Sequence, residues 1–226
     1  MTTIAMIPGA GGDGWFLHPL VTDLRDRGFD AFAVDLPTAG PHDGLAAAAD
    51  AVVDAIGGRT DVVLVAQSMG GFTAPLVWSR VSVRMVVFVN AMIPLPGETV
   101  GEWGENVGST QAREAAARAG GYPTDFTDEV YFLDGFAPEL VREVARHDKP
   151  QSDAVFADSS RFSWPDAPIH VIAGRDDRLF PLALQQRVAR ERVGVEPDVV
   201  PGGHLAPLSH PSPIGALVAG YVEELG

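Results

Sequence analysis

The chain has 226 residues, a formal net charge of −14 and no cysteine. This length suits one α/β domain with a sizeable core. The acidic surplus disfavours nucleic acid and anionic membranes as partners, and the lack of cysteine excludes disulfide and thiol chemistry.

The N-terminal segment predicts a strand over residues 2–7, followed by a glycine-rich loop over residues 8–15. A loop of this kind brings backbone amides close to a bound group, because glycine has no side chain to keep the ligand away. One such amide, which we place at Ala10, is a candidate hydrogen-bond donor to an oxyanion.

The same loop allows a second interpretation. Gly9, Gly11 and Gly14 can be aligned with the dinucleotide-binding fingerprint, and Asp35, at the end of a predicted strand over 30–35, could then bind a ribose. This interpretation explains neither the serine motif nor the histidine motif described next. We therefore favour the oxyanion-binding loop.

The third predicted strand, residues 61–66, runs directly into Ala66-Gln67-Ser68-Met69-Gly70-Gly71 and then into a predicted helix. A serine at a tight strand-to-helix corner between small residues is the nucleophile elbow of α/β-hydrolases. Ala66 and Gly70 supply the small residues, so Ser68 is the candidate nucleophile. The amide of Met69, the residue after it, is the second candidate oxyanion donor.

A long segment, residues 95–164, follows the fourth predicted strand at 84–90. It is too long for a simple loop in a compact domain. Its helical candidates cover residues 109–119, 125–132 and 138–147. We interpret it as a helical cap inserted over Ser68, and call it the cap segment. Residues 1–94 and 165–226 then form the core.

Two more polar motifs follow predicted strands. The strand at 169–173 leads to the adjacent pair Asp176 and Asp177, and the strand at 196–200 leads to His204. Parallel strands end at one edge of a sheet, which is where open α/β sheets bind ligands. We therefore expect these side chains to meet Ser68 at that edge.

The order serine, acid, histidine along the chain is the order of α/β-hydrolases. A serine hydroxyl is a weak nucleophile unless a base removes its proton and an acid orients that base. Ser68, His204 and Asp177 are the candidates for these three roles. Adjacent aspartates in a turn point in different directions, so only one of the pair is expected to reach the histidine.

Strands alternate with helical stretches along the core. The predicted helices cover residues 15–27, 44–56, 69–80, 182–191 and 212–224. Such alternation predicts an α/β fold with a mostly parallel sheet of about six strands and helices on both faces.

These motifs together resemble the α/β-hydrolase superfamily, and within it the small esterases related to plant methyl-ester esterases and hydroxynitrile lyases. The resemblance covers residues 2–94 and 165–226. The family-like spacing to Pro181 implies that Asp177, rather than Asp176, is the acid. Pro8 departs from the pattern, because a histidine often precedes the first glycine of this loop.

The resemblance also implies a choice between two reactions. Lyases of this branch carry a threonine in the oxyanion loop and a lysine directly after the catalytic histidine. The corresponding residues here are Gly9 and Leu205. Leu205 cannot stabilise a departing cyanide, which favours an esterase.

We therefore expect a carboxylesterase that acts on small, largely apolar or aryl esters through an acyl-enzyme. Lactone, thioester or C–C bond hydrolysis, perhydrolysis, and a ligand receptor that retains the three residues stay open as alternatives. No histidines have the spacing of a zinc-binding helix, so no metal and no cofactor are expected.

The expected partner is a small-molecule ester, with no nucleic acid and no membrane; a homodimer is left open. The N-terminal residues lack a basic region followed by an apolar stretch. We accordingly expect no signal peptide and a cytoplasmic location.

Overall fold

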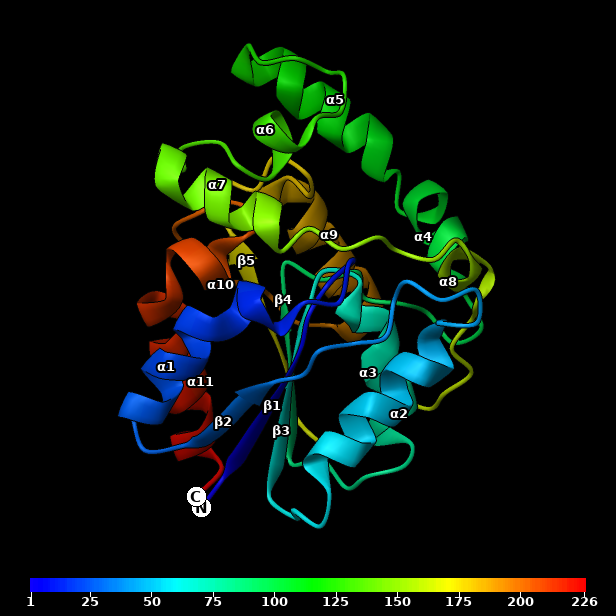
Figure 1. Ribbon diagram of the computed structural model, residues 1–226, viewed down its shortest axis with the longest axis vertical. Coiled ribbons are helices and arrows are strands. Elements are labelled where there is room, and N and C mark those ends of the chain that lie inside the picture. Colours follow the sequence, from blue (N-terminus) through cyan, green and yellow to red (C-terminus); the bar gives the residue numbers. More distant parts are fainter.

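The computed structural model describes residues 1–226 and contains one six-stranded sheet, in the order β2-β1-β3-β4-β5-β6 (Figure 1). Every neighbouring pair of strands is parallel. The strands are β1 (Thr3–Ile7), β2 (Asp30–Ala33), β3 (Val62–Gln67), β4 (Met85–Val89), β5 (Ile169–Gly174) and β6 (Asp198–Val200). The predicted fold class is confirmed, and the sheet is wholly rather than mostly parallel.

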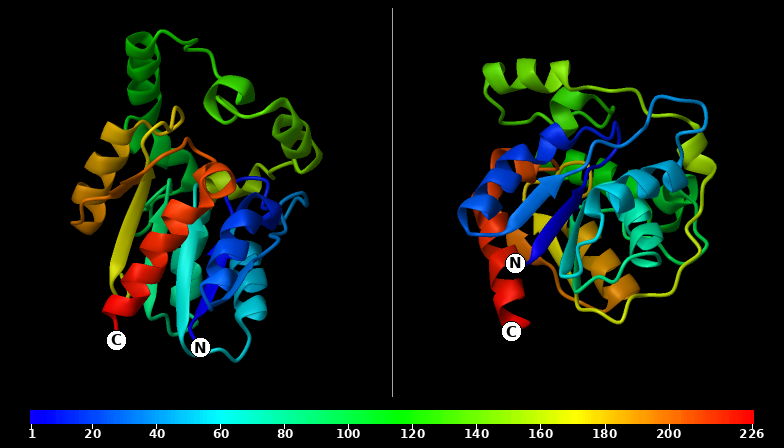
Figure 2. Two further views of the ribbon diagram at one scale, coloured as in Figure 1. Left: turned by 90° about the vertical axis from the view of Figure 1, so that its left-hand side faces the viewer. Right: turned by 60° about the horizontal axis from the view of Figure 1, so that its bottom comes forward.

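Helices cover both faces of the sheet (Figures 1 and 2). One face packs against α1 (His18–Asp26) and α11 (Pro211–Glu224), and the other against α2 (Leu45–Ile56), α3 (Gly70–Trp78) and α9 (Leu182–Val193). Successive side chains of a strand point to opposite faces. In β3, Val63 and Val65 therefore join one apolar cluster, while Leu64 and Ala66 join the other. No helix is both long and apolar enough to cross a membrane.

Two expected helices have different bounds, and three short helices, α4 (Val100–Asn106), α8 (Ala154–Ala157) and α10 (Ala206–Ser209), were not expected. The helix expected over 15–27 is divided into a 3₁₀ turn (Gly14–Leu17) and α1. The one expected over 125–132 shortens to α6 (Asp128–Tyr131), because the Thr127 hydroxyl accepts the Val130 amide and caps the helix there. The four-residue helix α10 follows His204.

The cap segment connects β4 to β5 and carries five helices. They are α4 (Val100–Asn106), α5 (Ser109–Gly120), α6, α7 (Pro138–Arg146) and α8 (Ala154–Ala157). Figure 1 places α5, α6 and α7 beyond the end of the sheet at which the parallel strands finish. The expected helices at 109–119 and 138–147 agree with α5 and α7 to within one residue. The division into core and cap units stays a prediction.

The chain enters the cap segment through a buried ion pair. Glu98 precedes α4, and its carboxylate contacts the guanidinium of Arg192 on α9; both side chains are nearly inaccessible to solvent. Burial alone would raise the pKa of Glu98, but hydrogen bonds from Arg192 and Asn106 hold it below its usual value of 4.5. This pair fixes the start of the cap segment to the core.

Candidate active site

The predicted site segments all lie at the edge of the sheet where the strands end. Ser68 follows β3, Asp177 follows β5 and His204 follows β6, while the glycine-rich loop follows β1. This common position is a consequence of the parallel topology, in which ligand sites form beyond the carboxyl ends of the strands. The structure brings together Ser68, Asp177 and His204, which lie far apart in the sequence.

Ser68 occupies a strained corner between β3 and α3. Its φ angle is +51°, a left-handed conformation that costs a non-glycine residue free energy and that is common at functional sites. The corner lies against β1: a Cβ on Gly70 would be 2.6 Å from the carbonyl oxygen of Pro8. The small residue at this position is therefore required by the backbone, as expected for a nucleophile elbow.

A continuous chain of hydrogen bonds joins the three side chains. The Ser68 hydroxyl lies 2.8 Å from Nε2 of His204, and Nδ1 of His204 lies 2.9 Å from Oδ2 of Asp177. With its proton on Nδ1, the imidazole donates to Asp177 and accepts from Ser68. The side chains of His204 and Asp177 are buried, so water does not compete for these contacts.

Asp177 is held in place by its own hydrogen bonds. Its Oδ1 accepts the amides of Leu179 and Phe180, both at 2.9 Å, and its Oδ2 also accepts from Nε2 of Gln185 at 3.3 Å. Asp176 points elsewhere: its carboxylate accepts the amide of Gly202 and pairs with Arg175. Only Asp177 therefore contacts His204.

The two candidate oxyanion donors, Ala10 and Met69, both have free amides. Neither amide donates a hydrogen bond to any protein acceptor. Ala10 lines the cavity that contains Ser68, and Met69 is the residue that precedes α3. Amides at the start of a helix favour negative charge, so the Met69 amide has the electrostatics that an oxyanion requires.

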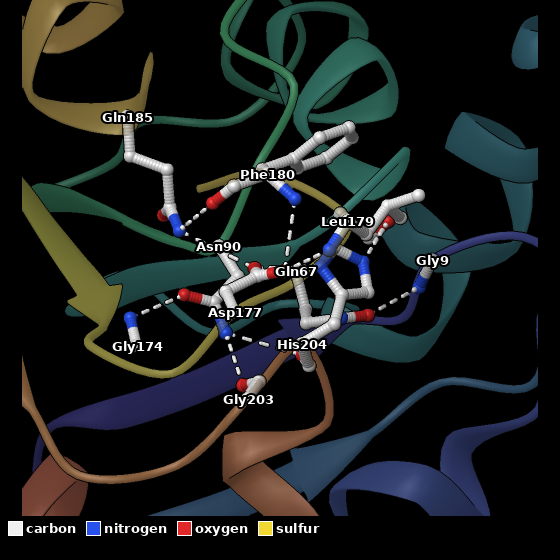
Figure 3. A network of polar contacts seen from close by, with 11 residues as sticks. Gly9, Gln67, Asn90, Gly174, Asp177, Leu179, Phe180, Gln185, Gly203 and His204 are labelled. Atoms are coloured by element: carbon white, nitrogen blue, oxygen red, sulfur yellow. Dashed lines mark hydrogen bonds and ion pairs between the residues drawn. The ribbon is translucent and has the colours of Figure 1, made fainter. Parts of the chain in front are cut away.

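Two buried amide side chains connect the loops of the site (Figure 3). Gln67 accepts the Gly9 amide at 3.1 Å and donates to the carbonyl of His204 at 3.2 Å. Asn90 accepts the Gly174 amide at 2.6 Å and donates to the carbonyls of Gly203 and His204. Sequence reasoning missed both, although each is a polar residue at the end of a buried strand.

A cavity of about 330 Å³ opens above Ser68, between the core and the cap segment. Its size is within the range of small-molecule sites. The mainly apolar lining comes from the core and from α6, α7 and their flanks: Pro8, Phe16, Phe132, Leu133, Val141, Val144, Ala145 and Leu205. Three carboxylates, Asp128, Glu129 and Asp148, also line it, and no lysine or arginine does.

Partial loss of hydration raises the pKa of Asp128, although its side chain stays largely exposed, and the charges of Asp148 and Glu129 add to this effect. The cavity therefore combines apolar walls with a negative potential on its cap side. At its base it offers a hydroxyl next to a base, with free amides nearby, which are the components of acyl transfer.

Several solved structures have the same fold. An extracellular α/β-hydrolase from a Paenibacillus species, described as sharing structural and functional homology with tobacco salicylic acid binding protein 2, superimposes with a TM-score of 0.76 at 16% identity and covers 97% of this chain and 98% of its own. A methylesterase from Arabidopsis gives a TM-score of 0.76 at 18% identity, with 99% of both chains covered. Polyneuridine aldehyde esterase gives 0.73 at 18% identity, with 98% of this chain and 99% of its own covered.

At these identities the likeness shows the fold. No curated protein matches the sequence. A family model described as the alpha/beta hydrolase family matches residues 4–217, which is nearly the whole chain. The resemblance inferred from the motifs is confirmed: the chain belongs to the alpha/beta hydrolase family, and its neighbours in structure include a plant methylesterase and polyneuridine aldehyde esterase.

Proposed function

We propose that this hydrolase is a serine carboxylesterase that cleaves small, largely apolar or aryl esters through an acyl-enzyme. The observation that carries the proposal is the hydrogen-bond chain from Ser68 through His204 to Asp177 at the base of an apolar cavity. A serine hydroxyl in hydrogen-bond contact with an oriented imidazole is the arrangement that nucleophilic acyl transfer needs.

The proposed reaction has two steps. The Ser68 hydroxyl attacks the ester carbonyl while Nε2 of His204 takes its proton, and Asp177 stabilises the imidazolium that results. The amides of Ala10 and Met69 bind the tetrahedral oxyanion, each donor lowering the barrier by about 3 kcal/mol. His204 then protonates the departing alcohol, and water repeats the sequence on the acyl-enzyme to release the acid.

The cavity supports a particular class of ester. Its apolar walls favour alkyl or aryl groups on the acyl or alcohol side. Its carboxylates, with no cation among the lining residues, disfavour ester substrates that carry a negative charge. Leu205 lines the cavity directly after His204, where a cation would be needed to stabilise departing cyanide. Cyanohydrin cleavage is therefore not proposed.

The test is the hydrolysis of p-nitrophenyl esters with alkyl acyl groups of increasing length, together with p-nitrophenyl benzoate, whose acyl group is aromatic. We expect turnover that depends on chain length and that disappears in Ser68→Ala. Tight binding of these compounds without turnover would favour a ligand receptor. Turnover confined to thioesters or lactones would change the assigned substrate class, and Ser68 would remain the proposed nucleophile.

A matched pair of substrates tests the charge of the cavity. The neutral p-nitrophenyl butyrate should be hydrolysed with a higher kcat/KM than the p-nitrophenyl monoester of succinic acid, because the latter brings a carboxylate towards Asp128, Glu129 and Asp148. These carboxylates are exposed, so the difference should shrink as salt is added. Equal kcat/KM values at low salt would contradict the assigned substrate preference.

A further inference from the structure

Three consecutive amides of the loop after β1 have different surroundings. The outer two, on Gly9 and Gly11, each donate to a glutamine side-chain carbonyl at 3.1 Å, from Gln67 and Gln151 respectively. The middle one, on Ala10, has no protein acceptor. We propose that Gln67 and Gln151 are positioning residues that aim the Ala10 amide at the reacting carbonyl oxygen, so that the cap segment helps to form the oxyanion hole.

Gln67 fixes the loop from the core side. Its side chain is buried, and it holds the Gly9 amide and the His204 carbonyl at the same time. The Gly9 backbone lies directly against the nucleophile, because a Cβ on Gly9 would be 2.7 Å from the Cβ of Ser68. Gln67 therefore sets the distance between the loop and both reacting side chains.

Gln151 fixes the loop from the opposite side, and it belongs to the cap segment. It follows α7 and reaches down to the Gly11 amide, across 140 residues of sequence. The approach is close: a Cβ on Gly11 would be 3.0 Å from the Lys149 carbonyl oxygen, and its φ of +77° also favours glycine. The backbones of the loop and the cap segment are thus in direct contact at this point.

Further contacts tie the same two segments together. The carboxylate of Asp13, at the end of the loop, lies 3.0 Å from Nζ of Lys149 and 3.1 Å from Nδ1 of His147. Burial alone would raise the pKa of Asp13, but hydrogen bonds from the Trp15 amide, Lys149 and His147 bring it below its usual value. The Trp15 ring also stacks on His147 at 4.1 Å. Asp13 is therefore ionised at neutral pH and holds residues 147–151 over the loop.

A misplaced Ala10 amide would slow the chemical step and would leave substrate binding largely unchanged. An oxyanion donor contributes only if it is already in place when charge develops on the carbonyl oxygen. A displacement of about 1 Å can lower the rate by about a hundredfold. This inference rests on the proposed esterase function, since it assigns a role in that reaction to a residue of the cap segment.

Gln151→Met provides the test, because methionine keeps the length of the side chain and replaces the amide oxygen with a sulfur that is only a weak acceptor. Gln151→Glu, which keeps an acceptor oxygen, is the conservative variant, and Gln111→Ala, an exposed glutamine of α5, is the control. Amide hydrogen exchange of the peptide covering residues 8–14 reports on the loop without requiring activity. Ester kinetics and the affinity of a trifluoromethyl ketone, which forms a tetrahedral oxyanion on serine, report on the hole.

For Gln151→Met we expect faster exchange in residues 8–14, a kcat lower by about ten- to a hundredfold and a matching loss of trifluoromethyl ketone affinity. KM and Tm should stay close to those of the wild type. Gln151→Glu should keep the loop protected from exchange, and Gln111→Ala should change nothing.

Unchanged exchange in Gln151→Met, or faster exchange with an unchanged kcat, would overturn the positioning role. A fall in Tm together with a rise in KM would also overturn it, because these would indicate a structural role only. The proposed function fails differently: a wild-type protein that hydrolyses no ester and forms no adduct with the ketone would refute it before any variant is compared.

Discussion

At the scale of single residues, the two adjacent aspartates give the sharpest contrast. Asp177 is buried against His204, whereas Asp176 is half exposed and holds the turn through Gly202. Removing the acid that fixes the imidazole tautomer costs on the order of 10⁴ in kcat. We predict that Asp177→Asn is nearly inactive but folded.

Asp176→Asn is the matched control for this prediction. It should keep most of the activity and lose about 1 kcal/mol of stability, because only a turn hydrogen bond and an exposed ion pair are weakened. kcat and Tm of both variants decide the question. The reverse pattern would assign the acid to Asp176.

The residues proposed to carry the chemistry could be located from the sequence because each one follows directly on a strand that is easy to recognise. Ser68, Asp177 and His204 each come after an apolar, β-branched run, and the structure brings them within hydrogen-bond distance. Gln67, Asn90 and Gln151 could not be assigned in this way. Their role depends on which backbone amides lie opposite them, and that is decided by how the loops meet in three dimensions.

At the scale of elements, replacing glycine with alanine is expected to change the free energy of unfolding in opposite directions in α3 and α11. A Cβ on Gly71, in the first turn of α3, would be 2.2 Å from the carbonyl oxygen of Met92. Gly220, inside α11, has nothing within 4 Å of such an atom. We predict that Gly71→Ala lowers the free energy of unfolding by about 1–3 kcal/mol or more, as overpacking does.

Gly220→Ala should have the opposite sign and raise the free energy of unfolding by about 0.5–1 kcal/mol, since alanine is the better helix former. Chemical denaturation of both variants measures the two values. Equal effects of the same sign would contradict the close contact between Gly71 and the carbonyl oxygen of Met92.

The accuracy of the sequence-based elements follows their length. All six strands were predicted: the inner strands β1, β3, β4 and β5 are buried apolar runs, and the short edge strands β2 and β6 alternate with the predicted helices. The helices that were missed, α4, α8 and α10, are four to seven residues long. Such helices span too few turns to show a period, and α4 also contains Gly101 and Gly104. Its start is fixed instead by a capping box between Thr99 and Glu102, which is a local contact.

At the scale of the whole molecule, the ion pair between Glu98 and Arg192 connects the cap segment to the core. Breaking a buried pair by removing one partner costs about 3–5 kcal/mol, because the other charge is left uncompensated. We predict that Glu98→Gln is destabilised by an amount of this order at pH 7. The difference in Tm between Glu98→Gln and the wild type, measured as a function of pH, should be largest at neutral pH.

The sign of the pH dependence follows from the depressed pKa of Glu98. The stabilisation is complete above the usual carboxyl value of 4.5 and is lost as the pH falls through the lower value in the folded protein. The gap between variant and wild type should therefore narrow below that pH. Glu191→Gln, from the exposed pair with Arg187, should leave Tm nearly unchanged at every pH. A gap independent of pH would contradict the ionised pair.

In the proposed esterase, Ser68, activated by His204, is the covalent nucleophile. The most direct measurement is peptide mass spectrometry after treatment with a fluorophosphonate probe. We predict one adduct, located on Ser68, that is absent in Ser68→Ala and much slower to form in His204→Ala, while His210→Ala labels like the wild type. Labelling that persists in Ser68→Ala, or that depends on His210 rather than His204, would contradict the account.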